Sequence, residues 1–271
     1  MRKFKLDSIF TRSGDAEEPQ MEKSTGGVLA VWGAPGSGKT AVAVKLAKQL
    51  ADHKKNVALV LCDMTAPMLP CICPPAALDG ADRSLGSILA ATRVTGSLVK
   101  NNCVTHKQMP YLTILGLKPG ENEYSYPACT QKQVTELIAA LRELTPYVIF
   151  DCSSYIASDI LSAMALLEAD SVLRLASCDP KSLSYFKSQL PLLEEKEWDA
   201  DRQYKAISNL KPNQAVGQME QALGGAAFRL PYSAELEEQY LASDLFAPLS
   251  LKDSRPFRKE LARICKEVFD V

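Results

Sequence analysis

The sequence predicts an α/β fold, namely a doubly wound, mostly parallel sheet with helices on both faces. Short apolar runs that are typical of buried strands alternate with longer segments whose apolar residues recur at helical spacing. A glycine-rich turn separates the first of these runs from the first helical segment. Such alternation is typical of a parallel sheet whose two faces are both covered.

The first elements are a strand, a turn and a helix. Residues 28–32 are an apolar run, and residues 41–50 have helical spacing. After a charged turn at residues 52–55, a second apolar run over residues 56–62 ends at Asp63. We expect the two runs to be parallel buried strands that the helix connects.

The same alternation continues through the rest of the chain. The strand candidates are residues 111–115, 147–150, 171–176, 203–208 and 226–230. The helix candidates are residues 131–144, 156–168 and 180–194. Residues 66–81, rich in proline and cysteine, interrupt the pattern, and we expect them to form a surface loop beside the carboxyl end of the second strand.

One domain is expected over residues 27–271, after a flexible tail over residues 1–26. The tail is charged and polar, so it cannot bury enough apolar area to offset the entropy of ordering. We find no repeat and no linker after residue 26. A chain of 271 residues can bury roughly three quarters of the surface that it exposes when unfolded, so it needs no disulfide for stability.

Composition argues against several classes of protein. No apolar run approaches the roughly 20 residues of a membrane-spanning helix. The formal net charge is −1, so specific DNA binding is not indicated. The N-terminus lacks the apolar stretch of a secretory signal, and several of the eight cysteines lie in apolar runs, so we expect a cytoplasmic protein with reduced thiols. Cys71 and Cys73 are too close in sequence for the usual zinc spacing, and no second pair is near.

The most specific motif lies between the first strand and the first helix. It is the P-loop pattern formed by Gly33, Ala34, Pro35, Gly36, Ser37, Gly38, Lys39 and Thr40. The glycines let the backbone curl so that N–H groups point at phosphate oxygens, and the helix from Ala41 directs its positive end at the same place. Lys39 would bridge the β and γ phosphates, and the Thr40 hydroxyl would ligate Mg²⁺. The motif predicts a site for ATP or ADP with Mg²⁺, since a plain turn needs neither side chain.

Two carboxylates follow neighbouring strands. Asp63 ends the run 56–62, and Asp151 ends the run 147–150, so both should stand at the edge of the sheet where the crevice forms. In P-loop proteins such a carboxylate completes the outer shell of the metal or orients the attacking water. Capping of the next segment is the alternative for either residue. The candidate catalytic residues are therefore Lys39, Asp63 and Asp151, and the candidate metal ligands are Thr40, Asp63 and Asp151.

At these positions the sequence resembles the MinD/ParA group of P-loop ATPases, over residues 27 to about 250. The segments that carry the resemblance are the P-loop, Asp63, residues 148–151, residues 228–232 and residues 241–248. The last two are the most telling, because a P-loop alone is shared by many unrelated activities. The resemblance implies that Asn209, Pro231 and Tyr232 flank the adenine. It also implies a nucleotide-dependent homodimer and protein partners in a pilus, secretion, conjugation or division apparatus.

Three positions depart from the pattern of that group. Ala34 stands where most members have a signature lysine, which removes the charge that would reach the nucleotide of a neighbouring subunit. Thr65 stands where a catalytic aspartate is usual, and Ser153 replaces a proline after the Walker B aspartate. Hydrolysis of ATP to ADP and phosphate is therefore expected to be slow or lost. Loss of these elements with a retained pocket resembles the pilus-localising TadZ/CpaE branch.

Two further functions and two surfaces are left open by the sequence. The chain could be a degenerate scaffold that dimerises without nucleotide and recruits partners, or a plasmid or chromosome partition ATPase. Residues 255–271 have one apolar helical stripe, which fits a helix packed on the sheet better than a membrane anchor. The basic and apolar residues 2–12 could contact a membrane or a partner, but a disordered tail is the simpler interpretation. Membrane association is thus expected, if at all, through a partner.

Overall fold

The computed structural model describes residues 26–189, 191 and 202–271. Its nine-stranded sheet has the order β3-β4-β5-β2-β6-β1-β7-β8-β9. The strands are β1 (Gly27–Gly33), β2 (Val57–Leu61), β3 (Leu78–Asp79), β4 (Val104–His106), β5 (Met109–Leu115), β6 (Tyr147–Asp151), β7 (Ser171–Ser177), β8 (Gln203–Leu210) and β9 (Phe228–Pro231). All neighbours from β5 to β9 pair in parallel, and only β3 and β4 add antiparallel pairs at one edge.

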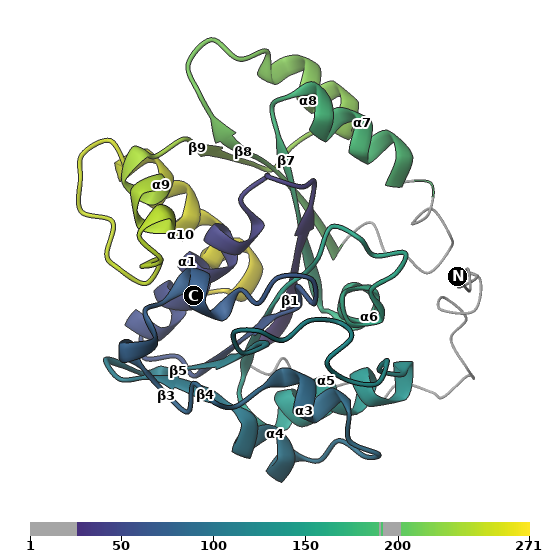
Figure 1. Ribbon diagram of the computed structural model, residues 1–271. Helices are drawn as coiled ribbons and strands as arrows, with labels where there is room; N and C mark the ends of the chain where they lie inside the picture. The colour runs from purple at the N-terminus through teal and green to yellow at the C-terminus, as the bar shows by residue number, and fades with distance from the viewer. Residues whose placement is uncertain (1–25, 190, 192–201) are drawn as a thin grey trace.

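Helices cover both faces of this sheet (Figure 1). They are α1 (Lys39–Asp52), α2 (Leu69–Ile72), α3 (Leu85–Leu89), α4 (Gly96–Asn102), α5 (Gln131–Leu144), α6 (Ile160–Glu168), α7 (Pro180–Gln189), α8 (Val216–Leu223), α9 (Ala234–Leu241) and α10 (Arg255–Phe269). The doubly wound, mostly parallel architecture expected from the sequence is confirmed, and each of the seven strand candidates lies on a strand.

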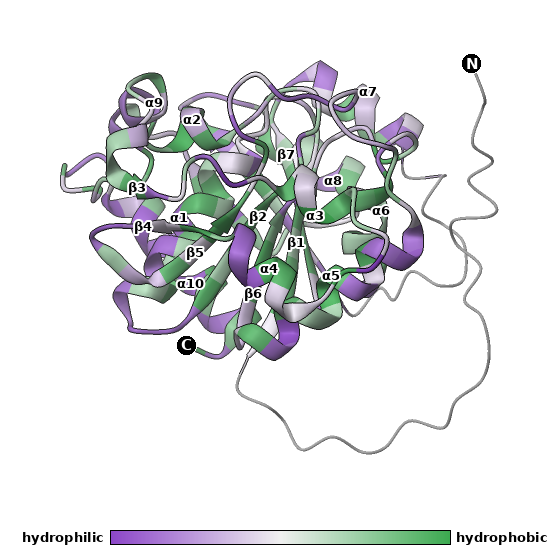
Figure 2. Cartoon of the chain, turned by 60° about the horizontal axis from the view of Figure 1, so that its bottom comes forward, coloured by the Kyte–Doolittle hydropathy of each residue, from purple (hydrophilic) through white to green (hydrophobic). Residues whose placement is uncertain are grey.

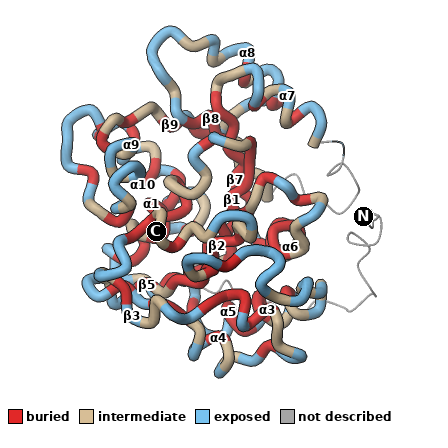
Figure 3. The backbone as a smooth tube through the Cα atoms, in the orientation of Figure 1, coloured by how far each residue is buried: buried red, intermediate tan, exposed pale blue. Residues whose placement is uncertain are grey.

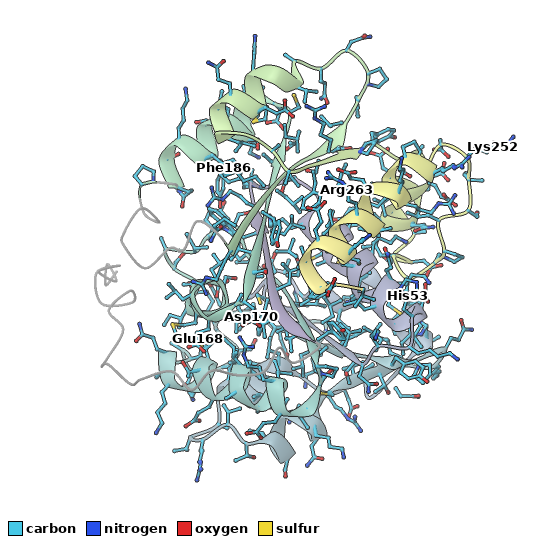
Figure 4. The ribbon with its side chains drawn as sticks, turned by 180° about the vertical axis from the view of Figure 1, so that it is seen from behind. His53, Glu168, Asp170, Phe186, Lys252 and Arg263 are labelled. Atoms are coloured by element: carbon cyan, nitrogen blue, oxygen red, sulfur yellow. The ribbon has the colours of Figure 1, made fainter. Side chains whose placement is uncertain are left out.

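Alternation along the central strands divides the core into two layers. In β1, Ala30 and Trp32 pack with α5, α6 and α7, whereas Leu29 and Val31 pack with α1 and α10. The strand is therefore buried on both of its faces, and Figure 3 shows the same burial along β1, β2 and β7. Figure 4 places Phe186 of α7 and Arg263 of α10 on opposite sides of the sheet. The continuous apolar runs in the sequence therefore follow from burial on both faces.

Local capping determines where α5 and α6 begin. Thr130 and Gln133 form a reciprocal capping box, so α5 starts where the sequence predicts. The helix predicted from residue 156 begins instead at Ile160, because the Asp159 side chain accepts from the N–H of Ser162 and fixes the N-cap there. The helix predicted over 180–194 is described as far as Gln189. Residues 190 and 192–194 lie outside the described residues, as does the predicted tail before residue 26.

The expectation of a surface loop over residues 66–81 is wrong for part of this stretch, which packs into the core. Leu69 and Ile72 lie on α2 and are fully or almost fully buried, and Cys73 is buried beside them. The Ile72 carbonyl accepts a 2.9 Å hydrogen bond from the Leu245 N–H, which ties α2 to the segment after α9. Proline in the first turn is compatible with a short helix, since its missing N–H would have no partner there anyway.

The C-terminal helix α10 packs on the sheet. Phe257, Leu261, Ile264 and Cys265 on its inner stripe are buried against α1 and β9, as the amphipathic pattern predicts. Figure 2 shows the hydrophobic strands enclosed by helices with hydrophilic outer faces. None of the helices in the described part of the chain combines the length and the hydropathy that a membrane span requires.

Candidate nucleotide-binding site

The P-loop segment curls between β1 and α1 and needs glycine at two points. A Cβ at Gly33 would lie 2.0 Å from the Leu175 carbonyl oxygen of β7, so no other residue fits this close approach. Gly38 has a φ of 78° and is the N-cap of α1. No side chain caps α1 and no acidic residue lies in its first turn, so its positive end faces the curl. This is the arrangement that binds a phosphate group.

The ammonium of Lys39 lies across the opening of this curl. Its Nζ donates to the Ala34 carbonyl at 3.2 Å and to the Ser154 hydroxyl at 2.6 Å. Burial lowers the pKa of Lys39, and the charges of Asp151 and Asp63 partly oppose that effect. Two protein groups thus hold the lysine within the P-loop.

Asp151 is buried at the carboxyl end of β6, next to the P-loop. Burial raises the pKa of Asp151 to about 6, against a hydrogen bond from Thr40 and the charge of Lys39, which both lower it. The Oδ1 atom has no hydrogen-bond partner among the described residues. A buried carboxylate oxygen without a partner, beside a threonine hydroxyl, fits a hard cation such as Mg²⁺.

Asp63 caps the loop that follows β2. Its Oδ1 accepts from the Thr65 N–H at 2.9 Å, from the Thr65 hydroxyl at 2.6 Å and from the Ala66 N–H at 3.1 Å. The capping role that the sequence left open is therefore present for this residue. Its charge still acts on Lys39 and Asp151. No cluster of three or more His, Cys, Asp or Glu side chains suited to a metal occurs in the described residues.

A cavity of about 330 Å³ extends from the P-loop towards the carboxyl ends of β8 and β9. The residues from the sequence prediction that line it are Gly36, Ser37, Gly38, Lys39, Thr40, Ala41, Asn209, Pro231 and Tyr232. The structure thus brings together the P-loop residues 36–41 and the predicted adenine residues. Gly33, Ala34, Pro35, Asp63 and Asp151 are not part of the lining of this cavity.

The sequence prediction missed the wall that α9 contributes. The additional lining residues include Ser208, Ser233, Leu236, Glu237, Tyr240 and Phe257. Ser233 accepts from the Leu236 N–H at 3.1 Å and caps α9, directly after β9. A serine after a strand, followed by acidic residues and helical spacing, is a start signal that could have placed this helix at the pocket.

Tyr232 is fixed at one side of the cavity. Its hydroxyl donates to Glu237 Oε2 at 2.6 Å, and its N–H donates to the Leu210 carbonyl at 2.8 Å. The Lys211 ammonium lies 4.7 Å from the centre of its ring. The ring is therefore held in place by contacts on its edge and its face.

Comparisons with known proteins identify the fold. No protein-family model matches the chain, and a search of curated proteins finds no match. The cell division ATPase MinD of Pyrococcus furiosus matches at 16% identity and a TM-score of 0.67, over 90% of this chain and 99% of that chain. A ParA family ATPase from Chlorobium tepidum TLS matches at 18% identity and a TM-score of 0.71, over 88% and 97%. Septum site-determining protein MinD of Pyrococcus horikoshii OT3, complexed with Mg-ADP, matches at 14% identity and a TM-score of 0.67, over 89% and 95%.

This chain has the MinD/ParA ATPase fold. Within that fold, Ala34 lies in the P-loop, Thr65 follows β2 and Ser153 follows β6. Ala34 is fully buried in the core, and its N–H donates to the Leu175 carbonyl. Thr65 is exposed, and its hydroxyl donates a hydrogen bond to Asp63. The Ser153 N–H donates to the Ser162 hydroxyl at 2.8 Å, which ties the loop after β6 to α6. None of the three positions presents a charged side chain to the site.

Proposed function

We propose that this chain, as one domain over residues 27–271, binds ATP and acts as a nucleotide-dependent switch in the cytoplasm. One observation carries the proposal: the P-loop curl and the cavity beside Asn209, Pro231 and Tyr232 are continuous. The curl suits the phosphates, and the cavity suits a flat base, so a single nucleotide can occupy both. The Pyrococcus horikoshii MinD, which shares the fold and is complexed with Mg-ADP, supports the same assignment.

The residues beside the P-loop fit a magnesium ion. Thr40 offers a hydroxyl and Asp151 a buried carboxylate whose Oδ1 lacks a partner among the described residues. When bound with nucleotide, the ion would neutralise part of the phosphate charge. Asp63 would act on the site mainly through its charge, because its Oδ1 is engaged by the loop 65–66.

Hydrolysis of ATP is proposed to be slow. Ala34 is buried and uncharged, and Thr65 offers a hydroxyl that already donates to Asp63, so neither position supplies a carboxylate or an ammonium to the reacting phosphate. Transition-state charge would then be stabilised chiefly by Lys39 and the P-loop N–H groups. Slow turnover suits a switch, because the ATP-bound state persists long enough to recruit a partner.

A nucleotide-dependent homodimer and partners in a pilus, secretion or division apparatus complete the proposal. The similar structures support this direction, since they are proteins of cell division and of the ParA family. We place the chain in the TadZ/CpaE branch, because Ala34 stands where a charged lysine is usual and Thr65 stands where an aspartate is usual. The γ-phosphate of bound ATP would order the loops near Asp63 and Asp151 and so alter the surface that the protein offers to partners.

Calorimetric titration with ATP and Mg²⁺ tests the nucleotide site. Parent protein is expected to bind, and Lys39→Ala is expected to abolish binding, because it removes the ammonium from the cradle. Equal affinity of the two proteins would refute the assignment. Light scattering after size exclusion, with and without ATP and Mg²⁺, then tests the switch: a mass that does not change with nucleotide would favour a nucleotide-independent scaffold.

A further inference from the structure

The hydroxyl of Ser154 joins the two ends of the P-loop. Ser154 is the third residue after β6 and is buried. Its Oγ accepts a 2.6 Å hydrogen bond from Lys39 Nζ and donates a 2.8 Å hydrogen bond to the Gly33 carbonyl. Gly33 and Lys39 are the first and seventh residues of the motif, so a single side chain from the loop after β6 spans the curl.

The bond to Gly33 determines which way the hydroxyl points. A serine hydroxyl has one proton, and the Gly33 carbonyl accepts it, so the oxygen can offer only lone pairs to Lys39. The ammonium has three N–H donors. Among the described residues it donates to Ala34 and Ser154, which leaves one N–H for a phosphate oxygen.

Helix α7 holds Ser154 from the other side. The Tyr185 hydroxyl donates to the Ser154 carbonyl at 2.8 Å. The centre of the Tyr185 ring lies 5.7 Å from the centre of the ring of Trp32, the residue that precedes Gly33. Trp32 is fully buried. Tyr185 therefore restrains the backbone of Ser154 and, through it, the direction of the hydroxyl.

We propose that Ser154 is a positioning residue for Lys39, and that Tyr185 acts through Ser154. This inference rests on the proposed function, because the position of Lys39 matters only when a polyphosphate binds. A lysine side chain loses substantial rotamer entropy when it is ordered. Because Ser154 orders Lys39 in advance, that loss no longer opposes binding.

Titration with two probes tests the role of Ser154. Ser154→Ala is expected to weaken binding of both Mg-ATP and inorganic tripolyphosphate by about tenfold, which corresponds to one charge-assisted hydrogen bond. Ser154→Thr keeps the hydroxyl and is expected to stay within about threefold of the parent. The matched control is Ser182→Ala on α7, since the Ser182 hydroxyl is buried and has no hydrogen-bond partner among the described residues. Its affinity should equal that of the parent.

A double-mutant cycle tests the route from Tyr185. Tyr185→Phe removes only the hydroxyl and is expected to weaken ATP binding by a few-fold. The double variant Ser154→Ala/Tyr185→Phe should bind ATP no more weakly than Ser154→Ala alone. Additive losses would overturn the route through Ser154. Unchanged affinity in Ser154→Ala, or a Thr variant as weak as the Ala variant, would overturn the positioning role while ATP binding by the parent stands. A parent that binds neither probe would overturn the proposed function and this inference together.

Discussion

Lys45 on α1 donates a 2.5 Å hydrogen bond to the Gln239 side chain on α9, and it also donates to the Ala247 carbonyl at 2.8 Å. The lysine is only 3% exposed. It therefore joins the helix that follows the P-loop to the helix that forms one wall of the candidate pocket. Burial lowers the pKa of Lys45 to about 8.

The lowered pKa of Lys45 predicts that stability rises at alkaline pH. The unfolded chain keeps this proton up to a pKa near 10.5, whereas the folded chain releases it near pH 8. Between these values the unfolded state binds more protons, so the free energy of unfolding increases with pH. The free energy of unfolding of the parent, relative to that of Lys45→Met, should increase by about 3 kcal/mol from pH 8 to pH 10.5. Urea denaturation at several pH values measures it.

A surface lysine provides the control for this experiment. Lys132→Met on α5 changes a side chain that is 81% exposed and leaves Lys45 in place. The pH dependence of this variant should match that of the parent. If Lys45→Met shows the same alkaline slope as well, the buried ammonium is not its source.

Glu235 predicts a loss of stability at acidic pH. Burial would raise its pKa, but hydrogen bonds from Ser254, Ser250 and the Leu251 N–H lower it to about 2. A depressed folded pKa contributes stability that is complete above the unfolded value near 4.5 and is lost as the pH falls towards 2. Glu235→Gln should reduce the free energy of unfolding at pH 7 by about 2 kcal/mol, the scale of hydrogen bonds to a charged group.

The acid dependence distinguishes this charge effect from simple loss of packing. Thermal unfolding of parent and Glu235→Gln between pH 7 and pH 2 should show the difference in stability shrinking below pH 4.5. A difference that stays constant over this range would contradict the role assigned to the carboxylate.

Local signals in the sequence were sufficient for most of the fold. Thr130 and Gln133 form a capping box that can be recognised three residues apart, and the apolar run 147–150 is one of the buried central strands. The motif at residues 33–40 likewise places the phosphate site, because its turn and helix are contiguous in the chain. Such features could be predicted because each depends on a few neighbouring residues.

The parts that could not be predicted depend on contacts between distant residues. Ser154 and Lys39 are 115 positions apart, so no spacing rule connects them. The burial of Leu69 and Ile72 depends on packing with distant segments, including the one that contains Leu245, and this made a proline-rich stretch look like an exposed loop. Tertiary contacts of this kind override local composition.

Tyr232 allows recognition of the base to be tested separately from the phosphates. Tyr232→Ala removes a ring held beside the candidate pocket by Glu237 and Lys211. Binding of ATP should weaken by about fivefold to tenfold, the scale of one aromatic contact, while binding of tripolyphosphate should not change. Competition titration with both ligands makes the comparison. Equal losses for the two ligands would show that the substitution damages the P-loop rather than the base site.

Asp151 and Asp63 are predicted to differ in their effect on magnesium. Asp151→Asn replaces the buried carboxylate whose Oδ1 lacks a partner among the described residues, so Mg²⁺ should no longer strengthen ATP binding. Asp63→Asn should retain most of that effect, because the Asp63 Oδ1 is already engaged by Thr65 and Ala66. Calorimetry with ATP, once in excess Mg²⁺ and once in EDTA, gives the ratio of the two ATP affinities for each protein. A larger loss of the magnesium effect in Asp63→Asn than in Asp151→Asn would reverse the assignment, and the metal would then belong at the end of β2.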